Sequence, residues 1–166
     1  MEKKQDLSEV PLVTFQGIEH VHVAVVTAAW NPEVTDSMRD AAIQYMIECG
    51  VQRDHIHIEE VPGSFELPLG AQTLFENKDE VDGVVCIGCI IQGETRHFDF
   101  IADAVANGIM RVSLEYNAPV SFGVLTTNDQ QQALERAGGK HGNKGIEAAH
   151  AVLSMIRLYR ATDNDL

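Results

Sequence analysis

Short runs of apolar and β-branched residues alternate four times with longer amphipathic stretches between residues 20 and 160. Most of these runs are apolar at nearly every position rather than at every second one, as a strand that is buried on both faces must be. Strands of this kind belong to parallel sheets, because the crossover between parallel strands lays a helix over a face of the sheet. The predicted strands are 22–27, 55–61, 81–91 and 120–126.

The predicted fold class is α/β: a three-layer α/β/α sandwich of the flavodoxin-like kind around a four-stranded parallel sheet. Residues 11–15 are extended in pattern and predict an additional N-terminal edge strand. We divide the chain into a flexible N-terminal segment, 1–19, and a single domain, 20–166. The predicted helices are 32–49, 64–75, 96–116, 129–137 and 143–160.

Charge and cysteine content narrow the classes of partner and compartment. The net charge of −13 argues against nucleic acid and against an anionic membrane as the main partner, because both are polyanions. No run approaches the roughly 18 apolar residues of a membrane helix, and the first residues do not resemble a signal peptide. The three cysteines imply no disulfide framework, so we expect the protein in the reducing cytoplasm.

Ligand sites in open parallel sheets lie beyond the carboxyl ends of the strands. The most informative loop there is 93–99, Gly-Glu-Thr-Arg-His-Phe-Asp, which follows the third strand and opens the third helix. The unpaired N–H groups of a helix start suit an anion such as phosphate, and His97 can move protons near neutral pH. The other loops at this edge are 28–31, 62–66 and 125–128, which add aromatic rings, a carboxylate and hydroxyls.

Each residue at this edge also has an ordinary structural interpretation. Trp30 could simply pack, Ser64 and Thr95 could be helix N-caps, and a single histidine such as His97 is more often structural than catalytic. The convergence of several such residues on one edge favours a binding site for a flat, polar heterocycle beside a phosphate.

Two groups of residues have spacings that suggest metal or redox chemistry, but their expected positions in the sheet argue against both. Cys86 and Cys89 have C-x-x-C spacing, but residues three apart on a strand face opposite sides of the sheet, so the thiols cannot meet. His20 and His22 could face His55 and His57 on adjacent strands. These histidines lie at the amino ends of their strands with no completing carboxylate or thiol, so we predict edge or subunit contacts and no metal site.

Taken in order, the loops resemble those of the 6,7-dimethyl-8-ribityllumazine synthase family. The resemblance covers about residues 20–158 and rests on five motifs: 29–31 (AWN), 61–68 (VPGSFELP), 93–99 (GETRHFD), 122–127 (FGVLTT) and 135–145 (ERAGGKHGNKG). It implies a cofactor-independent enzyme that condenses 5-amino-6-(D-ribitylamino)uracil with L-3,4-dihydroxy-2-butanone 4-phosphate, releasing phosphate and water. This is the penultimate step of riboflavin biosynthesis.

The resemblance also implies a role for each matched residue. His97 would transfer protons as the catalytic residue. The phosphate would be bound by Glu94, Thr95 and Arg136. The pyrimidine substrate would be bound by Trp30, Ser64, Phe65, Glu66, Cys89, Ile90, Ile91, Phe122 and Lys144. In the family Phe122, Arg136 and Lys144 come from a neighbouring subunit.

Assembly follows from that sharing of the site. Members of the family form pentamers, and some assemble twelve pentamers into an icosahedral shell of 60 subunits. The short turn at 138–143 favours the shell for this chain. Segment 11–15 could add to the sheet edge of a neighbour. The resemblance names riboflavin synthase as a further partner to test.

Three positions depart from the family pattern. Trp30 stands where many members have Phe, Gln92 removes a positive charge near the phosphate, and Glu94 places a carboxylate in the phosphate turn. We expect activity to survive all three. Two other functions stay open from the residues alone: a non-catalytic protein that holds a flavin or lumazine, and a shell protein that has lost the chemistry.

Overall fold

The computed structural model describes residues 9–78 and 80–163, and its central layer is a parallel sheet of four strands. The strands are β1 (Val23–Ala28), β2 (Ile56–Val61), β3 (Gly83–Ile91) and β4 (Val120–Thr127), in the order β2-β1-β3-β4. All three pairings are parallel. The four-stranded parallel α/β fold predicted from the sequence is confirmed.

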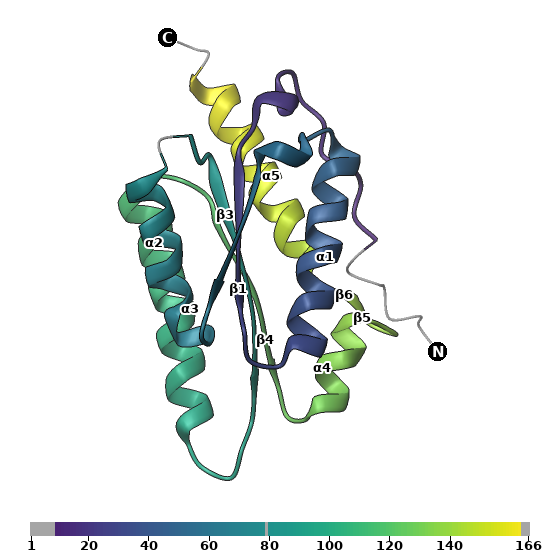
Figure 1. The fold of residues 1–166 in the computed structure, drawn as a ribbon, viewed down its shortest axis with the longest axis vertical. Helices are drawn as coiled ribbons and strands as arrows, with labels where there is room; N and C mark the ends of the chain where they lie inside the picture. The colour runs from purple at the N-terminus through teal and green to yellow at the C-terminus, as the bar shows by residue number, and fades with distance from the viewer. Residues whose placement is uncertain (1–8, 79, 164–166) are drawn as a thin grey trace.

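Helices cover both faces of this sheet (Figure 1). One face carries α1 (Pro32–Cys49), α4 (Gln130–Arg136) and α5 (Lys144–Asp163), and the other carries α2 (Leu67–Asn77) and α3 (His97–Tyr116). Each face has its own apolar cluster, because neighbouring residues of a strand point to opposite sides. Val25 and Val85 pack toward α1 and α5, whereas Ala24 and Val84 pack toward α2 and α3.

The same alternation separates the two cysteines of β3. Cys86 belongs to the cluster under α2 and α3, and Cys89 to the cluster under α1 and α5, as predicted. Burial raises the pKa of the Cys86 thiol to about 12 and that of Cys89 to about 11, because a thiolate is poorly solvated in an apolar core. Both therefore act as small core residues.

The predicted edge strand at 11–15 is wrong, because this segment is not part of the sheet. Its backbone groups are bound by side chains of α1 instead: the Val13 N–H donates to Cys49 Sγ at 3.3 Å, and Tyr45 Oη donates to the Pro11 carbonyl at 2.8 Å. The Val13 side chain is buried in the core. Residues 1–8, the first part of the predicted flexible segment, lie outside the described residues.

Two short segments differ from the predicted helices. The stretch predicted as a helix over 64–75 begins with a separate 3-10 turn, η3 (Ser64–Glu66), before α2. The turn at 138–143 is a small antiparallel hairpin of β5 (Ala137–Gly139) and β6 (Gly142–Asn143). Gly138 and Gly142 have φ values of 111° and 81°, a region in which side chains are strained.

The helices α1 and α5 cross at backbone contact. A Cβ on Gly145 would overlap the Met38 carbonyl, so no other residue fits at this crossing. The Ser37 hydroxyl on α1 donates to the Ala137 carbonyl at 2.5 Å, and Asn143 Nδ2 donates to the Ser37 carbonyl at 3.4 Å. These bonds fix the β5–β6 hairpin to the side of α1 (Figure 1). Within residues 9–78 and 80–163, no helix is long and apolar enough to cross a membrane.

Candidate active site

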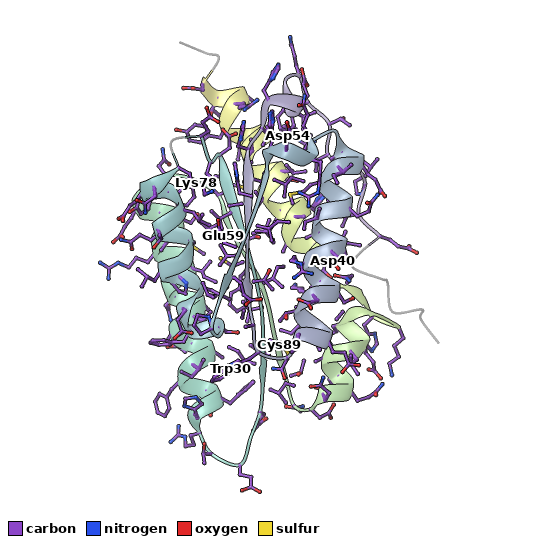
Figure 2. All side chains as sticks on the ribbon, in the orientation of Figure 1. Trp30, Asp40, Asp54, Glu59, Lys78 and Cys89 are labelled. Atoms are coloured by element: carbon purple, nitrogen blue, oxygen red, sulfur yellow. The ribbon has the colours of Figure 1, made fainter. Side chains whose placement is uncertain are left out.

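Four parallel strands end beside one another, and the loops that follow them form the candidate site. The loop after β1 is joined to the end of β2, because the Ala29 N–H donates to the Val61 carbonyl at 2.8 Å. The loop after β3 is joined to β4 in the same way, from the Gln92 N–H to the Thr127 carbonyl. Figure 2 shows Trp30 and Cys89 at this end of the sheet, with Asp54 and Lys78 at the opposite end.

Trp30 presents its indole to the surface and is 71% exposed. The next residue, Asn31, holds the loop: its backbone is left-handed with φ 60°, and its Nδ2 donates to the Cys89 carbonyl at 3.4 Å. A Cβ on Gly63 would lie 3.7 Å from the indole, so the loop after β2 passes close to this ring. Such an exposed and positioned aromatic ring suits stacking on a flat ligand.

The η3 turn gives Phe65, Glu66 and Ser64 different environments. Phe65 is 59% exposed, while one Glu66 carboxylate oxygen accepts the Gly63 N–H at 3.0 Å and so stiffens the turn. Ser64 is buried, and its hydroxyl has no hydrogen-bond partner in the structure. The Ser64 hydroxyl is therefore not the N-cap that its position had left open.

The predicted phosphate turn stands at the start of α3, and its residues 93–97 are exposed. Thr95 Oγ1 accepts the His97 N–H at 3.4 Å, but the N-cap residue of α3 is Arg96, which makes no side-chain capping hydrogen bond. A Cβ on Gly93 would meet nothing within 4 Å, so the turn is open on that side. An open helix start beside an exposed imidazole can bind an anion and exchange a proton with it.

The remaining predicted residues, Phe122, Arg136 and Lys144, belong to β4 and to the segment that follows it. Phe122 is exposed on the edge strand. Arg136 Nη1 donates to the Gln132 carbonyl of its own helix at 3.2 Å, and Lys144 Nζ lies 2.9 Å from Glu147 Oε2. The partners that the structure gives to these two cations thus come from their own segment.

The histidines at the amino ends of the strands form a compact group of three. The rings of His22 and His55 stack with centroids 4.0 Å apart, and His22 Nδ1 lies 3.3 Å from His57 Nε2. His20 instead lies beside Glu19. Among the residues that the structure describes, no group of three or more histidine, cysteine or carboxylate side chains could hold a metal ion.

Sequence reasoning missed two contributions to the site. Asn31 was part of a motif but had no role, although the Asn-Pro pair at 31–32 marks a turn in the sequence. In the structure Asn31 has a left-handed backbone with φ 60°. The other is the set of contacts that Glu135 makes with the β5–β6 hairpin. The glycines around Lys140 and His141, two before them and one after, would have predicted a hairpin there, but not its partner.

This arrangement defines a class: a flavodoxin-like α/β protein whose strand-end loops expose an aromatic ring, a helix start and a histidine. A family model described as 6,7-dimethyl-8-ribityllumazine synthase matches residues 20–160. The chain belongs to the 6,7-dimethyl-8-ribityllumazine synthase family, and its function is the lumazine-forming step of riboflavin biosynthesis.

Individual relatives agree over most of the chain. A 6,7-dimethyl-8-ribityllumazine synthase from Cytophaga hutchinsonii is 53% identical over 132 residues, which cover 80% of this chain and 82% of the relative. The synthase from Parabacteroides distasonis is 40% identical, covering 92% of this chain and 94% of the relative. The synthase from Thermus thermophilus is 42% identical, covering 91% and 94%. Members of this family are homo-oligomers that bind small-molecule substrates. The prediction of a lumazine-forming enzyme is confirmed, and the chain is not a pure binding protein.

Proposed function

We propose that the loops at the carboxyl edge of the sheet bind 5-amino-6-(D-ribitylamino)uracil and L-3,4-dihydroxy-2-butanone 4-phosphate side by side. The amine of the first adds to the ketone of the second and water leaves to give an imine. Phosphate is then eliminated, and ring closure releases a second water. Amine and ketone react with each other unaided, so the protein contributes mainly by orienting them.

The pyrimidine half of the site is built around Trp30. Its exposed indole provides a stacking surface, and Phe65 lies on the neighbouring turn. The ends of β2 and β3 offer backbone groups to the ring edge and the ribityl chain, from Ser64 to Glu66 and from Cys89 to Ile91. Cys89 already shares its carbonyl with Asn31, and Glu66 shares one carboxylate oxygen with Gly63. Polar atoms that remain in these groups would select the hydroxyl-rich substrate.

The phosphate half is built around the start of α3. The amides of Glu94 and Thr95 and the Thr95 hydroxyl would bind the phosphate oxygens, with the Glu94 carboxylate turned to solvent. Arg136 would add a charge-assisted pair of hydrogen bonds once its guanidinium leaves the Gln132 carbonyl. His97, the first residue of α3, would protonate the leaving phosphate and accept protons from the amine.

Two exposed apolar faces support a site that is shared between subunits. Leu69, Phe100 and Met110 are exposed on α2 and α3. A second face follows β4 and α5, with Phe122, Met155, Leu158 and Tyr159, beside a groove of about 400 Å³ between the end of α3 and α5. Two different faces on one chain suit a head-to-tail contact, which closes into a ring where the rotation between subunits completes a circle.

Such a ring would bring Phe122, Arg136 and Lys144 of one subunit to the His97 of the next. We propose the pentamer of the family, and twelve pentamers in a shell, since the hairpin turn is short. Riboflavin synthase is a further proposed partner, which a shell could enclose. The three buried free thiols support a reducing cytoplasm as the compartment.

The observation that carries the proposal is the meeting of Trp30, the open helix start and His97 at one edge. To test it, both substrates are mixed with the purified protein, and lumazine fluorescence is compared with a protein-free mixture. We expect a rate well above this background. In Arg136→Ala we expect weaker binding of the butanone phosphate, seen as a higher KM for that substrate. A wild-type rate equal to the background would overturn the proposal, and unchanged saturation in Arg136→Ala would overturn the phosphate clamp.

A further inference from the structure

The β5–β6 hairpin places two cations of the proposed site next to each other. Ala137 pairs with Asn143 in antiparallel register. Arg136 comes directly before Ala137 and Lys144 directly after Asn143, so both stand at the open end of the hairpin. The separation of the two cations therefore depends on how firmly the hairpin is closed. Figure 1 shows this hairpin beside α4 and α1.

Glu135 binds the tip of this hairpin through several contacts. Its Oε1 lies 2.9 Å from Lys140 Nζ and accepts from Gln131 Nε2 at 3.2 Å, while its Oε2 lies 3.8 Å from His141 Nε2. Its backbone carbonyl accepts the His141 N–H at 2.9 Å. The side chain is only 17% exposed. The hydrogen bonds from Lys140 and Gln131 lower the pKa of the Glu135 carboxyl, so it stays charged at neutral pH.

The arms of the hairpin are held by other residues. Ser37 on α1 donates to the Ala137 carbonyl, and Asn143 Oδ1 accepts the Gly145 N–H at 2.9 Å. The tip at Lys140 and His141 is bound to α4 through Glu135. Glu135 is thus the group that joins the helix carrying Arg136 to the far end of the hairpin that leads to Lys144.

We propose that Glu135 is a positioning residue for the condensation: it touches neither substrate and sets the placement of Arg136 and Lys144 for the phosphate and pyrimidine substrates. This inference rests on the proposed function, which gives those two cations their ligands. The carboxylate also neutralises Lys140, so Glu135 could instead act only through its charge. The two roles predict opposite changes in phosphate binding when the charge is removed. Removing its charge would then make the region more positive and tighten phosphate binding. Loss of positioning weakens it.

The test compares Glu135→Gln with Glu48→Gln in the assembled enzyme. Glu48 is a matched control, because it accepts a hydrogen bond from Gln44 four residues earlier, as Glu135 does from Gln131, but lies on the exposed side of α1. We expect Glu135→Gln to raise KM for the butanone phosphate about 10-fold, a loss typical of misplaced binding groups. KM for the pyrimidine should rise less, and kcat should stay within about threefold. Glu48→Gln should change none of them.

A second variant, Lys140→Met, keeps the inference testable if Glu135→Gln does not fold. It should raise KM for the phosphate substrate in the same direction, but the loss of a cation alone would also do so. The double variant therefore decides: its effect should be less than additive, because the two residues share one contact. A lowered or unchanged KM for the phosphate substrate in either variant would overturn the inference. So would additive effects in the double variant.

Failure of the inference is distinct from failure of the proposed function. If the wild type does not exceed the protein-free rate, the proposed function is wrong. If the wild type is active and Arg136→Ala weakens the phosphate substrate, while Glu135→Gln and Lys140→Met leave both KM values unchanged, only the positioning role of Glu135 is wrong.

Discussion

The amino ends of the strands form one edge of the sheet and the carboxyl ends form the opposite edge. Both edges are rich in polar residues, but these residues make different contacts. At the amino edge several polar groups bind one another: the His22 N–H donates to Asp82 Oδ2, and the Asp82 N–H donates back to the His22 carbonyl. Arg160 lies beside Asp82 and donates to the Gly17 carbonyl, whereas His55 Nδ1 is buried without a hydrogen-bond partner. At the carboxyl edge Trp30, Phe65 and His97 are exposed, and the Ser64 hydroxyl has no partner. Polar content alone therefore does not mark a site. The carboxyl edge differs because it combines two exposed aromatic rings with an exposed histidine at a helix start.

The largest expected difference between the edges is in catalysis. His97→Ala should slow turnover by about 10- to 10³-fold, the loss expected when acid–base help is removed, without changing the unfolding midpoint. The matched control is His20→Ala, an exposed histidine of the opposite edge, which should keep full activity. Steady-state rates corrected for the protein-free background provide the measurement. Equal losses in both variants would remove the functional distinction between the edges.

The next largest effect should be on stability at the amino edge. Asp82→Ala removes a charged acceptor from the His22 N–H and should lower the free energy of unfolding by about 1.5–3 kcal/mol. Asp40→Ala, which removes an exposed ion pair with Arg39, should cost less than about 1 kcal/mol. Urea unfolding at one protein concentration measures both. A change in kcat for Asp82→Ala with unchanged stability would contradict the structural role of this edge.

The amino edge should also be sensitive to acid. Burial lowers the pKa of His57 below its ordinary value, and Lys78 and His22 lower it further. The unfolded chain then binds more protons than the folded one, so stability falls as the pH drops below about 6.5 and through the lowered pKa. The free energy of unfolding should fall more between pH 7 and 5.5 in the wild type than in His57→Gln. Equal falls would show that His57 makes no contribution.

The smallest effect should appear at the carboxyl edge. Ser64→Ala removes a buried hydroxyl without a partner and should raise the free energy of unfolding by about 1 kcal/mol. If the hydroxyl serves the pyrimidine substrate, KM for that substrate should rise in the same variant. Thermal unfolding and saturation curves measure the two effects. A less stable variant would show that the hydroxyl is bonded within the folded protein.

The sequence predicted the layers well because they follow from local patterns. The helix at 32–49 was predicted with the observed bounds, since Pro32 opens it and Gly50 closes it with a left-handed backbone. The prediction of a strand at 11–15 was wrong because the conformation of this segment depends on side chains distant in sequence. Tyr45 and Cys49 bind its backbone groups in place of a neighbouring strand. No local pattern carries that information.

The candidate site divides in the same way. The placement of Thr95 and His97 at a helix start could be predicted, because the carboxyl ends of parallel strands share one edge. The contacts of Asn31 with Cys89 and of Glu135 with Lys140 could not, since they depend on how separate loops pack. The roles of individual residues came from the resemblance to a family, and they stay predictions until the variants are measured.

The division of the core into two faces has a consequence for synthesis on the ribosome. The cluster under α2 and α3 uses residues from Ala24 to Val124, whereas the cluster under α1 and α5 is completed only by Leu153 and Ile156. Because a chain emerges from its N-terminal end, one side of the sheet can be covered well before the other. The apolar residues of α1 that pack against α5 therefore stay exposed until α5, the last helix, has been synthesised.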